Sequence, residues 1–381
     1  MVFIDERLYN ILSLSLVFGC GSQKAVKIYL ALKESNRFGI TLKEALKGVD
    51  IDGKSRERLL GVNERDIEKI IGDCGNNGIR ILPIYDECYP ECLRNISVPP
   101  LVLFIKGTLP DFDNQPAFCI VGPRKITEFG YKAAYSLARR LAKSGMIIIS
   151  GSAAGGDYAA HTGALSAGGR CVMVLADGIV TEMNSKNHKL CDSILKDGCI
   201  ISETLPGDKA RKYSFPIRNR IMSGLGLGVA VVEAPEKSGT LITANHAAEQ
   251  GRDVFVVPGN PADPAYKGSN SLLRDGAIPL IDASDIFTRY IADFPEKINI
   301  QKAFEEKKDK PLKKNLQKKS LCSLSKEAQI VYNNLAKPEF TADDLIVPEL
   351  DTGSILSALT ELEIEHLIIS IPGGTYKISD Q

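Results

Sequence analysis

The sequence lacks the glycine signatures with which many enzymes hold a nucleotide. Neither the dinucleotide fingerprint GxGxxG nor a P-loop, GxxxxGKS or GxxxxGKT, occurs in its 381 residues. The four histidines form no metal-binding pattern, and none stands beside a candidate nucleophile in the sequence. Hydride transfer and nucleotide hydrolysis therefore have no support from the usual motifs, and we expect no metal, no cofactor and no catalytic residue.

An excess of charge of one sign is also absent, because 47 Lys and Arg residues balance 47 Asp and Glu residues. Such a chain is no general coat for nucleic acid, so any site for a polyanion must be local. The nine cysteines show neither the spacing of a zinc site nor the density of a disulfide scaffold, which indicates reduced thiols. No apolar run is long enough to cross a membrane, and the first residues lack the cationic start of a signal peptide. We therefore expect a soluble, cytoplasmic protein.

What the chain does have is enough apolar sequence, 44% of its residues, for two or three domains. Composition and periodicity divide it into a helical domain of the SAM or helix-hairpin-helix kind (1–80), an extended connector (81–114), an α/β domain (115–292), a basic linker (293–321) and a C-terminal module (322–381). In the helical part, the turn Gly19-Cys20-Gly21 could present backbone amides to a phosphate, or it could simply join two helices.

The central part alternates short β-branched runs with helical patterns. The runs cover residues 118–121, 146–150, 171–175, 199–202, 229–233 and 254–257. Nearly all of their residues are apolar, as in strands that helices cover on both faces. We therefore predict a doubly wound, mainly parallel sheet, in which ligands bind beyond the carboxyl ends of the strands.

Loops that contain glycine follow three of these runs. Gly122 follows the first, Gly151 and Gly155 follow the second, and the segment KSGT (237–240) follows the fifth. Small residues let backbone amides approach an anion closely, and a helix that begins at such a loop adds a positive end. The alternative is that these are tight turns with Asp157 and Thr240 as N-caps. Three such loops on one edge of the sheet favour an anion site.

The largest local imbalance of charge is the segment KARKYSFPIRNRI, residues 209–221, which follows the fourth run. It places five cations around two aromatic residues in a chain of zero formal net charge. Cations contact phosphates and aromatic rings stack on bases, so such a segment suits single-stranded nucleic acid. A solvated helix start beside a loop is the plainer alternative. If the segment faces the glycine loops, it forms one wall of a pocket.

From about Tyr89 to Ile286 the chain resembles the DNA-processing protein A family (DprA or Smf), bacterial proteins that load single-stranded DNA in natural transformation. The motifs stand in the family's order and spacing across nearly the whole central domain. They are VGPR (121–124), SGSAAGGD (150–157) with His161, SE (202–203), FPIRNRI (215–221), Glu233 with KSGTLITA (237–244), VPG (257–259), GSN (268–270) and RDGA (274–277).

The resemblance implies an extended Rossmann domain that binds single-stranded DNA, acts as a homodimer and passes the DNA to the recombinase RecA. By motif position, the main DNA contacts would be Arg124, Lys212 and Phe215. The two cations would neutralise phosphates, and the ring would stack on a base. The other residues expected in the DNA site are Lys125, the glycines Gly122, Gly151 and Gly155 as backbone of close approach, Asn219 and Arg220 as pocket or scaffold residues, and Arg218, with a packing network as its alternative role.

The chain departs from the family pattern in two loops. Ala154 stands where the family typically has Arg, and Met183 and Asn184 replace a Tyr-Pro pair. Loss of the cation at position 154 should weaken phosphate binding or move it to Lys125 or Lys186.

An enzyme is the alternative function. The second glycine loop and the segment 237–240 also resemble LOG-like phosphoribohydrolases, which share this Rossmann variant. Those enzymes usually carry Pro-Gly-Gly at the loop after the fifth strand, where this chain has Ala-Pro-Glu-Lys (234–237). Glu233 would then be the candidate carboxylate, with helix capping as its other role.

The C-terminal part indicates helices followed by a short hairpin, which suggests the winged-helix module that some members of the family carry. The segment before it (302–319) holds eight lysines and three acids, typical of a solvated linker. Residues 338–376 contain eight carboxylates and neither Lys nor Arg. Because phosphate contact needs cations, we expect this module to contact protein or to regulate, and not to bind duplex DNA.

Overall fold

The structure is a computed structural model of the chain. It describes residues 4–185, 187–305, 324–335, 339–345, 347, 350–364, 367–371 and 375–378. The chain divides into two compact units, residues 1–305 and 306–381. Lys186, most of the predicted basic linker and the predicted Pro-Gly-Gly turn (372–374) lie outside the described residues.

A nine-stranded sheet forms the centre of the first unit. Its strands are β1 (Arg80–Pro83), β2 (Val102–Gly107), β3 (Ala117–Val121), β4 (Ile147–Ser150), β5 (Cys171–Leu175), β6 (Cys199–Ser202), β7 (Gly228–Val231), β8 (Asp253–Val256) and β9 (Ile278–Pro279). They stand in the order β1-β2-β6-β5-β4-β3-β7-β8-β9. All neighbours from β6 to β9 pair in parallel, whereas β2 pairs antiparallel with both β6 and β1.

The predicted doubly wound, mainly parallel sheet is confirmed, and the six predicted runs are β3 to β8. Nearly every residue of these strands is buried, and at the core Phe118 packs edge-on against Phe255 and Tyr290. Burial of a Phe side chain stabilises the fold by about 1.5–3 kcal/mol, so these apolar runs are the main source of stability for the sheet. The segment expected to be a connector contributes β2 and most of β1 to the sheet.

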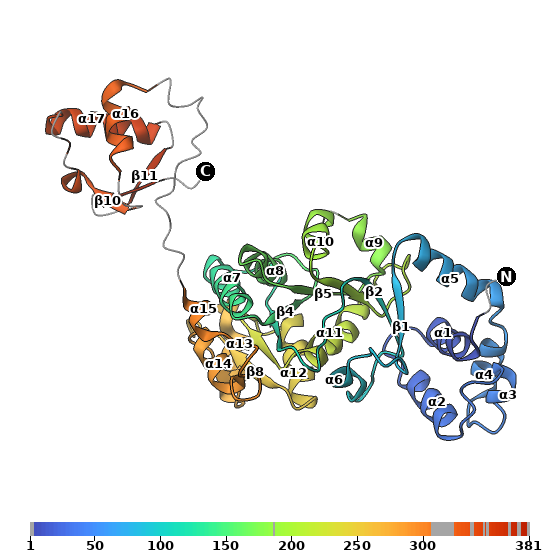
Figure 1. The fold of residues 1–381 in the computed structure, drawn as a ribbon. Coiled ribbons are helices and arrows are strands. Elements are labelled where there is room, and N and C mark those ends of the chain that lie inside the picture. Colours follow the sequence, from blue (N-terminus) through green and yellow to red (C-terminus); the bar gives the residue numbers. More distant parts are fainter. Residues whose placement is uncertain are drawn as a thin grey trace. The chain divides into compact units, whose positions relative to one another are not determined.

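Helices cover both faces of the sheet (Figure 1). They are α6 (Glu91–Arg94), α7 (Glu128–Lys143), α8 (Gly156–Ser166), α9 (Ile179–Met183), α10 (His188–Ile194), α11 (Ser214–Leu225), α12 (Gly239–Glu249), η1 (Pro264–Tyr266), α13 (Lys267–Arg274), α14 (Ala283–Tyr290) and α15 (Ile300–Phe304). Helices α7 and α8 pack against each other on one face, and α11 and α12 pack together on the other.

The order of the strands reverses between β3 and β7. From β3 the chain adds β4, β5 and β6 on one side, and it then returns to add β7, β8 and β9 on the other side. The loops after β3 and β7 therefore diverge to opposite faces, which leaves a crevice at the carboxyl ends of the strands.

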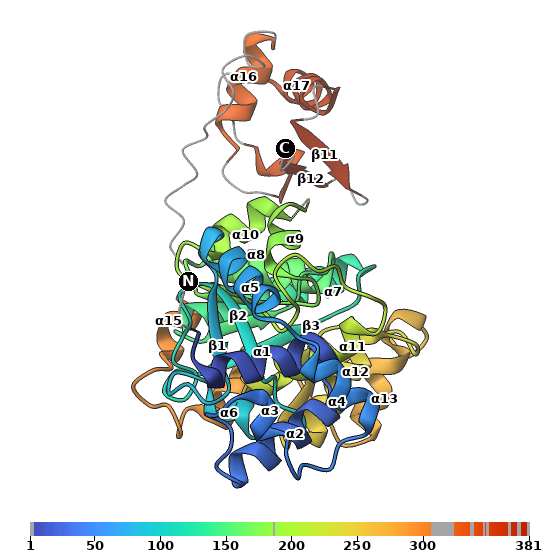
Figure 2. The ribbon, with the colours of Figure 1, turned by 90° about the vertical axis from the view of Figure 1, so that its right-hand side faces the viewer.

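Residues 6–76 contain five short helices, which lie against the β1 and β2 edge (Figure 1). They are α1 (Glu6–Phe18), α2 (Gln23–Glu34), α3 (Leu42–Ala45), α4 (Gly53–Leu60) and α5 (Glu64–Asn76). Helix α1 contacts β2 and all four of these other helices, and Figure 2 views it from this edge. Its residues Ile11, Leu12 and Leu14 are fully buried in a core that continues into the sheet. The N-terminal helices and the sheet therefore fold as one unit.

The second unit has its own small core. Its elements are α16 (Lys326–Asn333), β10 (Glu339–Thr341), η3 (Ala342–Asp344), α17 (Thr352–Ile364), β11 (Ile368–Ile371) and β12 (Thr375–Ile378), and its three strands pair antiparallel in the order β10-β12-β11. Val331, Leu359 and Leu362 are buried between the two helices and the sheet. Helices followed by a paired hairpin match the expected succession, and the winged-helix assignment itself stays a prediction. Among the described residues of both units, no helix has the length and apolar character needed to cross a bilayer.

Candidate functional site

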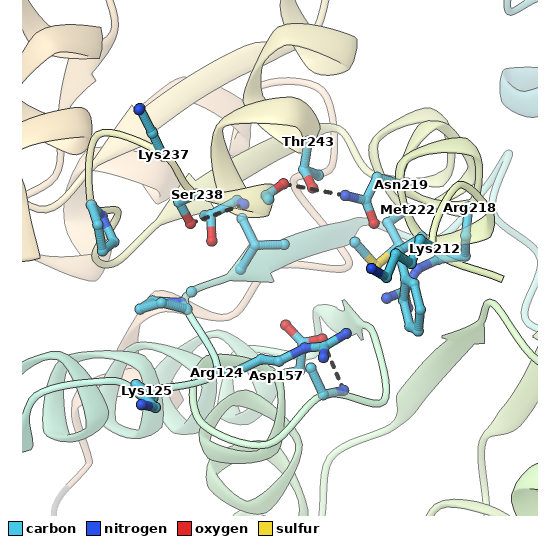
Figure 3. Close-up of a pocket in the computed structure, with 18 residues that line it drawn as sticks. Arg124, Lys125, Asp157, Lys212, Arg218, Asn219, Met222, Lys237, Ser238 and Thr243 are labelled. Carbon is cyan, nitrogen blue, oxygen red and sulfur yellow. Dashed lines mark hydrogen bonds between the residues drawn. The ribbon is translucent and has the colours of Figure 1, made fainter. Parts of the chain in front are cut away.

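A cavity of about 510 Å³ opens at the point where the strand order reverses. The loops after β3, β4 and β7 line it together with the first turns of α11 and α12 (Figure 3). Four exposed cations, Arg124, Lys125, Lys212 and Lys237, stand around it, and the lining contains one carboxylate, Asp157, which is buried. The cavity therefore has the charge that an anionic ligand needs.

Arg124 and Phe215 meet across this cavity. The guanidinium carbon of Arg124 lies 4.9 Å from the centre of the Phe215 ring, which is the geometry of a cation–π contact. Phe215 is half-buried in the first turn of α11, and Lys212 is exposed just before that helix begins. The three residues expected to be the main DNA contacts are thus brought together in one cavity.

The glycines after β3 and β4 let two loops touch through their backbones. Gly155 adopts a φ of 82°, and an added side chain would collide with the carbonyl oxygens of Pro123 and Arg124. The next amide, that of Gly156, donates a hydrogen bond to the Pro123 oxygen at 3.1 Å, and Gly156 leaves no room for a Cβ against Gly122. These glycines therefore fix the backbone from which Arg124 projects. Of the three expected in the site, Gly122 lines the cavity, whereas Gly151 and Gly155 lie behind it.

A buried polar network forms the base of the cavity. The Arg218 guanidinium donates a hydrogen bond to the carbonyl oxygen of Val174 and lies close to Asp157, whose Oδ2 accepts from the Ala153 amide at 3.2 Å. Burial raises the pKa of the Asp157 carboxyl, and the nearby guanidinium opposes that shift. Burial also lowers the pKa of His161 to about 4, so this imidazole is neutral at neutral pH, and its Nε2 lies 3.0 Å from the Gly151 oxygen. Arg218 lines the cavity but is only 6% exposed, which fits the packing network foreseen as its alternative role.

Asn219 and Arg220, neighbours on α11, point to different places. Asn219 lines the cavity, and its Nδ2 donates to the Gly239 oxygen at 3.3 Å. Arg220 is buried outside the lining and makes two hydrogen bonds, 2.8 and 2.9 Å long, to the carboxylate of Glu203. The same carboxylate accepts the amide of Gly21 at 3.1 Å. Glu203 therefore links Arg220 of α11 to the turn between α1 and α2. The Gly21 amide in this turn already donates to Glu203, so the turn connects the two helices and contacts α11 through this carboxylate.

Glu233, the candidate carboxylate of the enzymatic alternative, is fully buried and holds the start of α7. Its two oxygens accept from the Thr127 amide at 3.2 and 3.1 Å and from the Thr127 hydroxyl at 2.6 Å. Thr127 in turn caps α7 by accepting from the Gly130 amide at 3.0 Å. Glu233 thus supports a helix cap and does not line the cavity. The expected caps Asp157 and Thr240 are wrong in position, because Gly155 and Ser238 cap α8 and α12.

Several cavity residues were not among those expected to contact DNA. They are Val121, Pro123, Ala153, Asp157, Met222, Pro235, Lys237, Ser238, Gly239, Thr240 and Thr243. Lys237 could have been included, because it begins the glycine-bearing motif after the fifth predicted strand. Met222 had a helical signal, since it lies three and four residues after Asn219 and Arg218 on the same helix. In the part of the chain that the structure describes, no three His, Cys, Asp or Glu side chains come together as a metal site.

The fold and the site define a Rossmann-like protein with a cationic cavity at the reversal of its strand order. The family model of the DNA recombination-mediator protein A matches residues 80–291. The chain belongs to this family, and the resemblance inferred from its motifs is confirmed.

Relatives and solved structures agree with that assignment. The chain is 38% identical over 235 residues to the DNA processing protein DprA of Bacillus subtilis, which covers 62% of this chain and 77% of that one. It is 32% identical over 265 residues to the protein Smf of Escherichia coli, which covers 68% of each. The X-ray structure of DNA processing protein A from Streptococcus pneumoniae superposes with a TM-score of 0.66 at 32% identity, covering 74% of this chain and 97% of that chain. For the Helicobacter pylori protein, described for its single-stranded DNA binding mode, the TM-score is 0.51 at 28% identity, covering 56% and 96%.

Proposed function

We propose that this chain binds single-stranded DNA in the cavity at the reversal of strand order and performs no chemistry on it. The observation that carries the proposal is the contact of Arg124 with Phe215 inside a ring of cations. A guanidinium on an aromatic ring offers charge to a phosphate and a flat apolar surface to a base at the same place. The described binding mode of the Helicobacter pylori relative supports the same ligand.

Each residue around the cavity has a role that follows from its exposure. Arg124 and Lys212 are exposed and free to contact phosphates, and Lys125 and Lys237 extend the positive surface. Phe215 receives a base on its ring, and Asn219, with an amide oxygen in the lining, is placed to hydrogen-bond a base edge. The buried residues Arg218 and Arg220 act indirectly, because they hold α11 in place, and Gly122, Gly151 and Gly155 let the loops approach.

A salt titration tests this mechanism. If about three to five phosphates are neutralised, the logarithm of the affinity for oligo-dT should fall against the logarithm of the salt concentration with a slope of roughly −2 to −3.5. Fluorescence anisotropy with a labelled oligo-dT measures this slope directly. An affinity that does not change with salt would contradict an electrostatic pocket.

The wider role that we propose is to protect single-stranded DNA and pass it to the recombinase RecA during DNA uptake, with the protein acting as a homodimer. The family's description as a recombination mediator supports the RecA step. Light scattering that gives twice the monomer mass, together with binding of purified RecA to the immobilised chain, would support this role. A monomeric mass or no RecA binding would contradict the corresponding part.

The acidic second unit fits a protein-contact or regulatory role better than contact with duplex DNA. Between residues 338 and 376 the sequence has no cation to meet a phosphate. If the isolated residues 322–381 bound duplex DNA tightly at physiological salt, this part of the proposal would be wrong.

Turnover of a nucleotide is the competing function, and the position of Glu233 argues against it. Both of its carboxylate oxygens already accept hydrogen bonds from Thr127, in a buried position behind the cavity. We therefore expect no release of free base from nucleoside monophosphates. Detectable release by the wild type that Glu233→Gln abolishes would restore the enzymatic alternative.

A further inference from the structure

A second hollow, of about 370 Å³, lies at the same end of the sheet as the DNA cavity, between the loop after β8 and the start of α7. Its lining includes Phe129, whose side chain is exposed although the ring is large and apolar, with 59% of the residue accessible. The ring of Tyr266 stands against it, with the ring centres 6.1 Å apart and the planes at 72°. Isolated exposed hydrophobic residues are common, so the exposure of Phe129 alone does not indicate a binding site. What sets this site apart is the way it is built.

The floor of the hollow is held by partly buried hydrogen bonds. The Tyr266 hydroxyl lies 2.9 Å from the Thr127 hydroxyl, which itself donates to the buried Glu233. Tyr266 is therefore the donor, and its ring is fixed at one end. The backbone of Gly259 lies flat against this ring with no room for a side chain. The Asn270 side chain holds Gly259 in place, accepting from its amide at 3.3 Å and donating to its oxygen at 3.1 Å. An aromatic hollow fixed in this way is preorganised to receive a flat ring.

The hollow continues the DNA cavity along the same loop. Arg124 and Lys125 line the cavity, Thr127 lines the hollow, and Phe129 follows. Five peptide units separate the Cα atoms of Arg124 and Phe129 by at most ~18 Å, a distance that a few nucleotides span. Figure 3 shows Lys125 and Lys237 extending outward on the side of the cavity opposite Lys212. Both are exposed, so a strand that leaves the cavity on this side meets cations.

The charge of the hollow identifies the part of the nucleotide that fits. Asp263 contributes a carboxylate to the lining, one oxygen of which accepts from the Ala265 amide at 2.9 Å. A carboxylate repels a phosphate and can accept a hydrogen bond from the amino or imino group of a base. The aromatic surface with one acceptor at its edge therefore suits a nucleobase, with the phosphates outside over Lys125.

We propose that Phe129 and Tyr266 form a second base-stacking subsite, which receives a nucleobase of the same strand after it leaves the cavity of Arg124 and Phe215. This subsite rests on the proposed function. It lengthens the DNA footprint across the ends of β3, β7 and β8, and it adds affinity that depends on bases and not on phosphates.

The test compares Phe129→Ala with the wild type on oligo-dT of increasing length, from about 4 to about 16 nucleotides. Short oligomers that occupy the first cavity alone should bind both proteins equally. Oligomers long enough to reach the hollow should bind the variant roughly 5- to 150-fold more weakly, the loss expected for one stacked base. The salt slope should not change, because no phosphate contact is lost, and Phe129→Tyr should restore the affinity.

Two controls separate this subsite from the proposed function. Leu60→Ala removes an apolar residue of similar exposure, 47%, from α4 and should leave binding unchanged at every length. Lys212→Glu should weaken short and long oligomers alike. If Lys212→Glu weakens binding but Phe129→Ala does not, the subsite is wrong and the DNA cavity stands. If neither Lys212→Glu nor Arg124→Glu weakens binding, the proposed function itself fails.

A measurement on the wild type alone gives a second test, which does not depend on whether a variant folds correctly. A single abasic position moved along the shortest oligo-dT that fills both subsites should weaken binding at two separate places, one for each aromatic subsite. Sensitivity at a single place would overturn the second subsite, and so would an equal loss for short and long oligomers in Phe129→Ala.

Discussion

The guanidinium of Arg124 lies 4.9 Å from the ring centre of Phe215, although one residue follows β3 and the other begins α11. The contact orders a long cationic side chain and an aromatic ring before any ligand arrives. A ligand that uses both groups therefore loses less conformational entropy on binding. The glycine loops position Arg124, and the basic segment (residues 209–221) positions Phe215. The contact between the two residues therefore depends on both parts of the chain and on the sheet that places them.

Replacement of Phe215 should reduce affinity without changing electrostatics. We expect Phe215→Ala to weaken oligo-dT binding by about 1–3 kcal/mol, because a stacked base loses its platform. The salt slope should stay at the wild-type value, and Phe215→Tyr should bind nearly as tightly as the wild type. Equilibrium anisotropy titrations at several salt concentrations measure both quantities. Unchanged affinity in Phe215→Ala would show that the ring only packs within the protein and does not contact DNA.

Removal of Arg220 should act on stability. Its ion pair with Glu203 is buried, with side chains 7% and 13% exposed, and loss of one partner of such a pair costs about 3–5 kcal/mol. Urea unfolding of Arg220→Ala should show this loss, whereas Arg211→Ala, an exposed cation of the same segment, should stay within about 0.5 kcal/mol of the wild type. If Arg220→Ala were as stable as the wild type but failed to bind DNA, Arg220 would be a direct contact.

Gly155→Ala should displace the loop that carries Arg124. At a φ of 82° an alanine is strained, and its Cβ would collide with the Pro123 oxygen, so we expect a loss of about 1–3 kcal/mol in stability and weaker DNA binding. Gly207→Ala is the matched control, because a Cβ there meets no atom within 4 Å and the φ is not left-handed. Thermal unfolding and oligo-dT titration of both variants make the comparison. Equal behaviour of the two would contradict the role given to Gly155.

The buried His161 predicts a dependence of stability on pH. Burial lowers its pKa to about 4 in the folded chain from an ordinary value of 6.5, so the unfolded chain takes up the proton first as the pH falls. The stabilisation is complete above pH ~6.5 and is lost between pH ~6.5 and ~4, by about 3 kcal/mol in all. The pKa of Asp157, which burial raises, acts in the opposite direction at acid pH.

The contribution of His161 is therefore measured as a difference between two proteins. Urea unfolding of the wild type and of His161→Gln across this pH range should converge at acid pH, because Gln has no proton to gain and can still donate to the Gly151 oxygen. Parallel curves at all pH values would contradict a buried neutral histidine.

The sequence predicts the parallel part of the sheet because each of its strands is an apolar run. β1 is short, and the apolar run of β2, Val102 to Ile105, follows Pro99 and Pro100, which favour an extended connector. Pro83 ends β1, and β2 is defined by its antiparallel pairing with β6, where Phe104 faces Ser202. β9 has only two residues, Ile278 and Pro279. These strands depend on partners distant in the chain, which periodicity cannot show.

The cations of residues 209–221 show the same limit of sequence-based prediction, because their burial depends on partners that are distant in the chain. Lys212, Arg218 and Arg220 look alike in the sequence, yet only Lys212 is exposed. Residues two apart on a helix point to different sides, so Arg218 and Arg220 enter separate buried networks. The partner of Arg220, Glu203, lies on another loop, and Asp157, the charge with the largest effect on the pKa of Arg218, lies in α8. The motifs suggest the residues of the site and leave Asn219 and Arg220 as pocket or scaffold residues, whereas the partners that bury Arg218 and Arg220 can be identified only in the fold.

Charge reversal tests the central claim most directly. Oligo-dT binding should be measured for the wild type, Arg124→Glu, Lys212→Glu and Lys209→Glu, the last an exposed residue outside the cavity lining that controls for net charge. The account predicts that the first two variants lose about 1.5–3 kcal/mol or more, tenfold or greater, while Lys209→Glu changes little. Wild-type affinity in both Arg124→Glu and Lys212→Glu would contradict the assignment of this cavity to single-stranded DNA.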